Sequence, residues 1–246
     1  MYGVLLGTLG KSLIGEGAGG RSGRLGCRRG RGSGWPCARG GGAVDGTTQQ
    51  VHDLLREKSR RFQGCSAKPT AAVVDAQSVK ASANVAGAGQ GIDAGKKIKG
   101  RKRHLITDTL GLVLAVLVTA ANVHDTTRGK LLLDDLAAAL PSVTKVWADG
   151  GYQNSIFNHG ARLGIDVEVV QRPRTKGFEP LPKRWVIERT FGWLMQHRRL
   201  ARDCEALPQR LRAMTHWAMA NKMSRELTGE SAPTWRIETG IPLTSA

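Results

Sequence analysis

Between residues 71 and 227 the chain carries a series of apolar segments whose order few folds accommodate. Short runs rich in β-branched residues predict strands, and longer runs with apolar residues three and four positions apart predict helices. The expected order is a strand, a hairpin of two strands, a helix, a strand, a helix, a strand and two helices. Because three antiparallel strands are followed by strand–helix units, this order predicts a mixed sheet with helices on its faces, an α/β fold.

The first strand is expected in "TAAVVDAQSVK" and is expected to end at Asp75, and a hairpin joins "HLITDT" to "LVLAVLVTAANVHD" through Leu110 and Gly111. Between them, "ASANVAGAGQGIDAGKKIKGRKRH" is expected to form a long, basic, Gly-rich loop. The later strands are "SVTKVWADGGY", ending at Asp149, and "IDVEVVQRP". The helices are "GKLLLDDLAAAL", "SIFNHGARLG", a stretch from 183 to about 200, and residues 209–227.

The N-terminal part has a different composition. Sixteen of the 32 glycines lie in residues 1–46, with a run of arginines and no helical or strand period, so residues 1–45 are expected to be a disordered basic Gly/Arg-rich tail. The tail is either a nucleic-acid-binding segment or the product of a shifted reading frame in GC-rich DNA. Residues 46–70 are interpreted as the helical remnant of an N-terminal region, with Val51, Leu54, Leu55 and Phe62 on its apolar face. Residues 71–228 form the main domain and 229–246 a C-terminal tail.

The formal net charge of +17 points to a polyanionic partner, with nucleic acid first. A basic protein from a GC-rich genome is the plainer alternative. The four cysteines include no C-x-x-C pair and no His at finger spacing, which makes a zinc site an unfavoured interpretation. No apolar run reaches about 20 residues, so no membrane span is expected.

Three acidic residues are the candidates for chemistry. Asp75 and Asp149 each follow an apolar strand core, and ligand sites in such sheets lie at the carboxyl ends of strands. If the two strands are parallel neighbours, the carboxylates repel each other unless a cation, such as a divalent metal ion, lies between them. Glu188 sits beside the apolar stripe of the helix in "KRWVIERTFGWL". It is either the partner of Arg184 in a surface ion pair or the third acid of the site.

The segments "VVDAQSVK", "GKKIKGRKRHLITDTLGLVLAVLVTAANVHD", "WADGGY" and "RWVIERTFGWLMQHRRL" resemble the DDE transposases of bacterial insertion sequences, in the superfamily of the IS-four and IS-five kind. The motifs occur in the family's order across about residues 46–228. The resemblance implies a ribonuclease H-like catalytic domain. It also implies Asp75, Asp149 and Glu188 as the catalytic triad and as ligands of two divalent ions, Mg²⁺ with Mn²⁺ also accepted.

The family's signature around its glutamate contains a Tyr, an Arg, the Glu and a Lys. Arg184 and Glu188 match it, whereas Leu181 stands at the Tyr position and Met195 at the Lys position. These two departures concern contacts to substrate phosphate rather than the metal site.

Basic residues near these motifs are candidate contacts to DNA phosphates, and a solvated charged face is the alternative. The candidates are Lys96, Lys97, Lys99, Arg101, Lys102, Arg103, Arg184, Arg198 and Arg199, with His197 and Arg202 beside the last two. His104 and His124 are interpreted as hydrogen-bonding residues at strand ends, and Trp147, Trp185 and Trp193 as core.

The expected function is metal-dependent DNA strand cleavage and strand transfer of an insertion-sequence element. As the resemblance implies, water frees a 3′-hydroxyl at the element end, and this hydroxyl attacks target DNA. The expected partners are element ends, target DNA and further copies of the chain assembled on DNA. The expected location is the bacterial cytoplasm, in association with the nucleoid. The alternatives are a catalytically inactive, DNA-binding remnant of a transposase and a basic RNA-binding protein.

Overall fold

The computed structural model describes residues 46–152, 155–170 and 184–230 of the 246-residue chain. It is built on one mixed sheet. Strands β1 (Ala71–Lys80), β3 (Ile98–Asp108) and β4 (Val113–Ala120) are antiparallel neighbours, and β5 (Lys145–Asp149) and β6 (Asp166–Val170) continue the sheet parallel to β1. The short β2 (Gly91–Asp93) pairs with the start of β3. The predicted fold class, a ribonuclease H-like mixed sheet flanked by helices, is confirmed.

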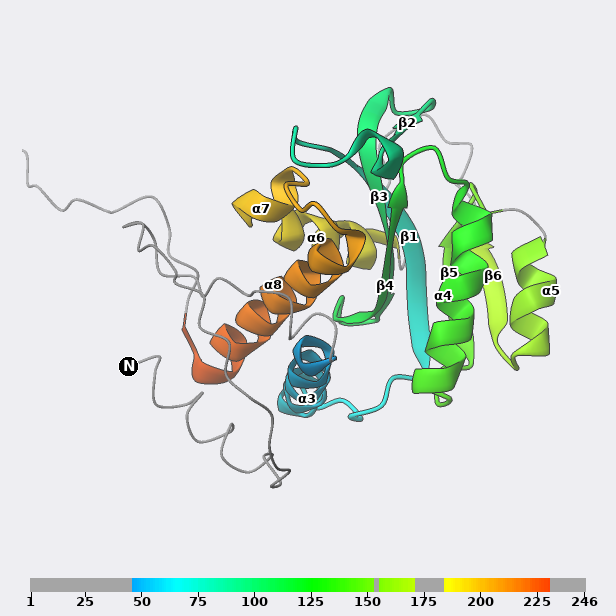
Figure 1. Cartoon of the computed structure of the whole chain (residues 1–246). Helices are drawn as coiled ribbons and strands as arrows, with labels where there is room; N and C mark the ends of the chain where they lie inside the picture. Colours follow the sequence, from blue (N-terminus) through cyan, green and yellow to red (C-terminus); the bar gives the residue numbers. More distant parts are fainter. Residues whose placement is uncertain (1–45, 153–154, 171–183, 231–246) are drawn as a thin grey trace, which may run out of the picture. The chain divides into compact units, whose positions relative to one another are not determined.

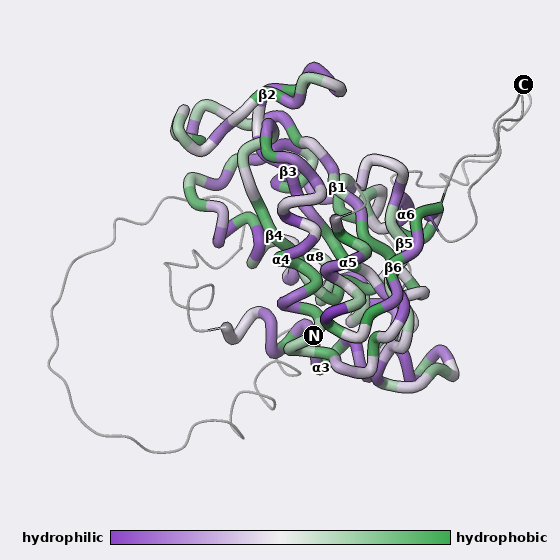
Figure 2. Tube along the Cα trace, turned by 90° about the vertical axis from the view of Figure 1, so that its right-hand side faces the viewer, coloured by the Kyte–Doolittle hydropathy of each residue, from purple (hydrophilic) through white to green (hydrophobic). Residues whose placement is uncertain are grey.

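Helices cover both faces of the sheet (Figure 1). One apolar cluster packs α4 (Asp125–Ala139) and α5 (Ser155–Arg162) against one face. A second cluster packs α6 (Arg184–Met195) and α8 (Pro208–Thr228) against the other, with the one-turn α7 (Arg198–Ala201) between them. Figure 2 shows apolar, green segments where the strands meet the helices, with hydrophilic, purple segments between them. No helix in the described residues is long and apolar enough to span a membrane.

The predicted hairpin at Leu110 and Gly111 is confirmed, and it anchors α6. Asp108 accepts hydrogen bonds from the backbone N–H groups of Leu110 (2.9 Å) and Leu112 (2.8 Å). Gly111 adopts a left-handed φ of 83° and accepts a hydrogen bond of 2.7 Å from the hydroxyl of Thr190 on α6. The turn therefore sets the position of the helix that carries Glu188.

Replacing Gly111 with Ala is expected to lower the free energy of unfolding by about 2–4 kcal/mol, because a left-handed backbone strains Ala and the new methyl group overpacks the turn. A Cβ at this position lies 2.8 Å from Thr190 Oγ1. Gly164→Ala is the matched control, since Gly164 has a φ of 73° but no neighbouring atom within 4 Å of its Cβ position. Urea unfolding of both variants measures the difference, and equal losses would contradict the steric contact with α6.

Three segment predictions are wrong. The first strand does not end at Asp75 but runs on to Lys80, because β3 pairs with it along its whole second half. The expected loop at 81–104 contains β2 and the beginning of β3, since the basic residues there alternate between the faces of a strand. The helix expected from 183 to about 200 is interrupted between Met195 and Arg198, and α7 is a separate turn.

The N-terminal helix α3 (Thr47–Phe62) buries a polar face, contrary to the predicted apolar one. Leu54 is 53% exposed and Phe62 66% exposed. The buried residues of this helix are Thr48, His52, Arg56, Ser59 and Arg60. The polar face is buried because α3 packs on α8, which presents polar side chains to it.

Two contacts illustrate the polar packing of α3. Arg212 donates to Gln49 at 2.9 Å, and the ring of His216 stacks on that of His52 with centroids 5.0 Å apart. Residues 46–70 thus belong to the packed structure. The predictions for the 1–45 tail, for Leu181 and for most of the 229–246 tail lie outside the described residues.

Candidate active site

The two aspartates lie side by side where β1 and β5 stop pairing. These strands are parallel, and their last paired residues are Val74 and Ala148, so Asp75 and Asp149 follow at the same level. Beyond this point β1 continues with β3 as its neighbour, and β5 ends. The predicted meeting of the two side chains therefore holds, although Asp75 lies within its strand and not at its end.

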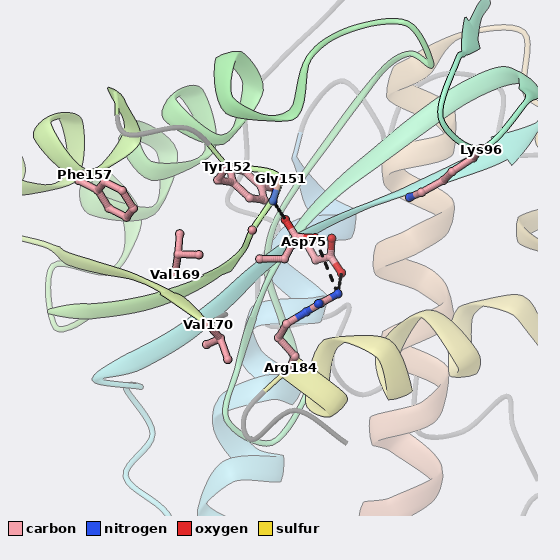
Figure 3. Close-up of a pocket in the computed structure, with 10 residues that line it drawn as sticks. Asp75, Lys96, Gly151, Tyr152, Phe157, Val169, Val170 and Arg184 are labelled. Carbon is pink, nitrogen blue, oxygen red and sulfur yellow. Dashed lines mark hydrogen bonds and ion pairs between the residues drawn. The ribbon is translucent and has the colours of Figure 1, made fainter. Parts of the chain in front are cut away.

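Arg184, at the start of α6, points toward the two aspartates (Figure 3) and also pairs with Glu188 one turn further along the same helix. Arg184 Nη2 lies 3.7 Å from Asp75 Oδ2, 3.8 Å from Asp149 Oδ2 and 3.4 Å from Glu188 Oε1. Three carboxylates from β1, β5 and α6 thus surround one guanidinium nitrogen. The ion pair expected between Glu188 and Arg184 is present, and the side chain of Glu188 is 56% exposed. Its role as the third acid of the site stays a prediction.

The environment of Asp75 disfavours its charged form. Burial, together with the neighbouring Asp149, raises the pKa of Asp75 to about 6, although the Ala76 N–H, Arg184 and Lys96 act in the opposite direction. The Nε atom of Arg184 is buried and has no hydrogen-bond partner within the described ranges. Three convergent carboxylates that hold a cation are a donor set that suits hard divalent ions, so the residues fit a metal site of this kind.

Metal-ligand spacing is not formed in this conformation. In the described ranges, no group of three or more His, Cys, Asp or Glu side chains lies close enough together to hold a metal ion. Because the guanidinium of Arg184 lies between the three carboxylates, their oxygens contact this nitrogen rather than a common point. Binding of a metal ion by all three acids therefore requires the Arg184 side chain to move.

Asp75, Asp149 and Arg184 line an open pocket of about 780 Å³. Figure 3 shows Lys96 reaching toward it from one side and Phe157, Val169 and Val170 lining the other. Gly151 donates its N–H to Asp149 Oδ1 at 2.9 Å and so orients this carboxylate. A Cβ on Gly151 would lie 3.0 Å from the same oxygen, so a larger residue here would require the Asp149 carboxylate to shift slightly.

Tyr152 is a pocket residue that sequence reasoning missed. It is buried in the lining of the pocket, and its hydroxyl has no hydrogen-bond partner among the residues that the structure describes. Burial raises its pKa well above the usual value, and Asp75, Asp125 and Asp149 act in the same direction. Its ring faces Gly129 of α4, where a Cβ would lie only 2.7 Å from a ring carbon. The available signal was its place directly after "WADGG", next to Asp149.

The structure divides the predicted basic cluster of 96–103. Lys96, Lys97 and Lys99 are exposed, and Lys96 Nζ lies 3.2 Å from the carbonyl oxygen of Ala76, at the pocket. The exposed loop expected for Arg101, Lys102 and Arg103 is wrong: all three side chains are buried, with exposures of 2%, 7% and 0%. They are not available to DNA in this conformation.

Internal partners explain the burial of two of them. Arg101 forms an ion pair with Asp203 at 3.2 Å and donates to three backbone carbonyl groups. Lys102 Nζ lies 3.0 Å from Asp125 Oδ1 and donates to the carbonyl oxygen of Val123.

The remaining predicted residues are two arginines on α7 and two histidines. Arg198 and Arg199 are exposed on α7, and Arg199 forms an ion pair of 2.5 Å with Glu205. His104 lies inside β3 and not at a strand end, and it shares a hydrogen bond of 2.9 Å with Thr119. His124 caps α4, accepting a hydrogen bond from the Thr126 N–H.

Two of the three tryptophans pack against the core. Trp147 and Trp193 lie against the apolar cluster beneath α6. The core prediction for Trp185 is wrong, since its side chain is 46% exposed. Arg189 lies over the rings of both Trp185 and Trp193, with distances to the ring centroids of 4.5 Å and 4.7 Å.

Two comparisons with known proteins cover the part of the chain that carries this site. A family model described as the transposase DDE domain matches residues 66–221, a range that contains all three acids. A Burkholderia cepacia protein described as a transposase for insertion sequence element IS402 is 37% identical over 110 residues. The aligned part is 41% of this chain and 52% of that protein, so the chain spans about half the length of this curated relative.

Proposed function

The chain belongs to the family of the transposase DDE domain, and on this premise we propose that it cleaves DNA at the ends of an insertion-sequence element and transfers the freed strand to target DNA. The observation that carries the proposal is the convergence of Asp75, Asp149 and Glu188 on a single cationic nitrogen. Incubation of the chain with labelled duplexes that carry the element's ends and a divalent metal salt tests it. Strand cleavage is the expected result, and intact duplex is the result that would contradict it.

In this proposal the three acids hold divalent metal ions, two Mg²⁺ ions with Mn²⁺ also accepted. Bound metal ions would stabilise negative charge on the attacking and leaving oxygens of the scissile phosphate. The Gly151 N–H holds the carboxylate of Asp149 in place. Arg184 neutralises the acids in the present conformation, and its planar fork of N–H donors suits a phosphate oxygen of the DNA once it leaves them.

The proposed reaction has two steps. In the first, water attacks the phosphorus at the element end, the bond to the 3′-oxygen breaks, and a free 3′-hydroxyl results. In the second, this hydroxyl attacks a phosphate of target DNA, and a new phosphodiester bond replaces the broken one. Since two element ends and a target must meet, we propose that further copies of the chain assemble on the DNA. The bacterial cytoplasm, at the nucleoid, is the location that such a substrate implies.

The exposed lysines beside the pocket are proposed to contact DNA phosphates. Each phosphate contact to duplex DNA contributes a slope of about −0.9 to the logarithmic dependence of affinity on salt concentration. Replacing Lys96, Lys97 and Lys99 with Gln is therefore expected to flatten this slope by up to roughly 3 units, and to weaken binding to all sequences alike. Titration of labelled duplexes at several salt concentrations measures both.

A charge-matched control separates contact from general electrostatics. Lys58, Lys68 and Lys145 lie away from the pocket, and their replacement with Gln lowers the net charge equally. The control variant is expected to retain a slope close to that of the parent chain. Equal flattening in the two variants would show that the pocket lysines act only through net charge.

The inactive, DNA-binding remnant is the second candidate, because Met195 departs from the family signature and the proposed tail 1–45 matches no motif in the sequence. A remnant would bind element ends and scrambled duplexes with nearly equal affinity. An active transposase with intact end recognition would prefer its ends by about 10³-fold or more, the range of specific DNA-binding proteins. Affinities for both duplexes at the same salt concentration decide between the two.

A further inference from the structure

Arg103 on β3 is a buried arginine without a carboxylate partner in the part of the chain that the structure describes. Its Nη2 donates to Gln77 Oε1 and lies 3.6 Å from Met195 Sδ, while Nε and Nη1 have no hydrogen-bond partner. Burial lowers the pKa of the guanidinium to about 10, and Asp203 raises it only in part. At neutral pH Arg103 is therefore charged, and most of its donors are unused.

Such an arrangement destabilises a fold, since a buried charge without a partner loses its hydration and gains little in return. Arg101, two residues earlier on the same strand, shows how a structural arginine is accommodated: it pairs with Asp203 and donates to the carbonyl groups of Gly89, Glu205 and Ala206. The packing of β3 thus accounts for Arg101, whereas among the described residues Arg103 forms no ion pair of its own.

Arg103 lies on the same face of the sheet as Asp75. Arg103 pairs with Gln77 in the sheet, and Asp75 pairs with Leu105. Residues two apart on a strand share a face, so Arg103 and Asp75 lie on the same face as diagonal neighbours, for which Cα separations of about 7–8 Å are usual. The helix α6, which carries Glu188, covers this face.

A flexible side chain of α6 contacts Arg103. Met195, at the position where the family signature has a lysine, is 41% exposed and contacts the guanidinium through its sulfur atom. Methionine has three rotatable side-chain bonds and adapts its conformation readily. A rotation of this side chain would remove its contact with Nη2 without any movement of the backbone.

We propose that Arg103 binds a DNA backbone phosphate adjacent to the scissile phosphate when Met195 moves aside. The inference rests on the proposed function, because DNA is the anion it assumes. Unused guanidinium N–H groups are donors that phosphate oxygens accept strongly. In the family signature this cation is a lysine at the position of Met195 on α6. Here the positive charge would come instead from Arg103 on β3, in the sheet beneath α6.

The test uses the full chain, a labelled duplex carrying an element end, and buffer without divalent metal ions so that binding is separated from cleavage. Arg103→Met is expected to weaken binding about 10-fold or more, the equivalent of one charge-assisted hydrogen bond, and to reduce the salt slope by about 0.9. Its melting temperature is expected to equal or exceed that of the parent chain, since an unpaired buried charge is removed.

Arg101→Met is the matched control. It breaks a buried ion pair, so a lower melting temperature is expected, with the salt slope of the folded fraction unchanged.

Met195→Ala tests the contact between Met195 and Arg103 without removing a buried group. It is expected to strengthen binding several-fold in the parent chain and to have no effect in the Arg103→Met background. An unchanged salt slope in Arg103→Met, or equal effects of Met195→Ala in both backgrounds, would overturn the proposal.

Failure of this inference and failure of the proposed function give different results. If the parent chain cleaves element ends and Arg103→Met has the same salt slope as the parent chain, the proposed function stands and the phosphate contact is rejected. If the parent chain cleaves no DNA but its salt slope is reduced in Arg103→Met, the phosphate contact stands and the proposed function is rejected.

Discussion

Replacing Asp149 with Asn is expected to abolish metal-dependent strand cleavage, by roughly 10³-fold or more, because stabilisation by metal ions contributes several kcal/mol to such reactions and each 1.36 kcal/mol corresponds to a factor of ten. Asn keeps the size of the side chain and can still accept the hydrogen bond from the Gly151 N–H. The variant removes one negative charge from the site, so its affinity for DNA is expected to equal or exceed that of the parent chain. Cleavage of labelled element ends and duplex binding in the same buffer measure the two effects.

A control for this variant lies on the neighbouring strand. Asp166 begins β6, at the far end of the β5–β6 pair, where its exposed side chain forms an ion pair of 2.6 Å with Lys145. Asp166→Asn is expected to leave cleavage unchanged. Full cleavage by Asp149→Asn would exclude a metal-ligand role for this carboxylate, and a comparable loss in Asp166→Asn would show that the assay reports general damage.

Replacing Arg60 with Met is expected to lower the free energy of unfolding by about 3–5 kcal/mol, because it leaves a buried carboxylate unpaired. Arg60 Nη1 on α3 lies 2.5 Å from Asp108 Oδ2 in an ion pair whose members are 6% and 0% exposed. For a domain of this size the change corresponds to a drop in melting temperature of about 10 °C. Thermal unfolding followed by circular dichroism measures it.

The adjacent arginine supplies the comparison. Arg61 is 65% exposed and lies 3.7 Å from Glu57, one turn earlier, and exposed pairs of this kind contribute about 0.3–0.5 kcal/mol. Arg61→Met is therefore expected to change the melting temperature little. Combining Arg60→Met with Asp108→Asn is expected to recover part of the loss, since the buried charge is then removed from both sides. A small effect of Arg60→Met would show that α3 is a dispensable remnant rather than part of the fold.

Much of the catalytic geometry was predictable because it depends on chain order. The strands that carry Asp75 and Asp149 are recognisable by their apolar runs, and parallel neighbours bring their ends together. Glu188 was placed beside the buried stripe of its helix, and in the structure it pairs with Arg184, which also contacts both aspartates. The central position of Arg184 was not predictable, since it depends on distances between three separate elements.

The burial of charged residues was the part that sequence patterns misjudged. Arg101, Lys102 and Arg103 form a basic run that is typical of an exposed loop, yet all three are buried in β3. The partner of Arg101, Asp203, is 102 positions away. On α3, Leu54 and Phe62 are exposed, while Arg60 is buried by an aspartate 48 positions away.

By itself, then, the sequence determined the order of the main strands and helices, the fold class and the three acids of the candidate site. The physical basis is that apolar periodicity and the order of segments depend only on residues that are neighbours in the chain. The tertiary structure alone decided which cations are internal, which face of α3 is buried, and that Arg184 lies among the acids. The physical reason is that a charged side chain is buried only where distant groups pair with it or replace its hydration, and those groups come from other elements of the fold.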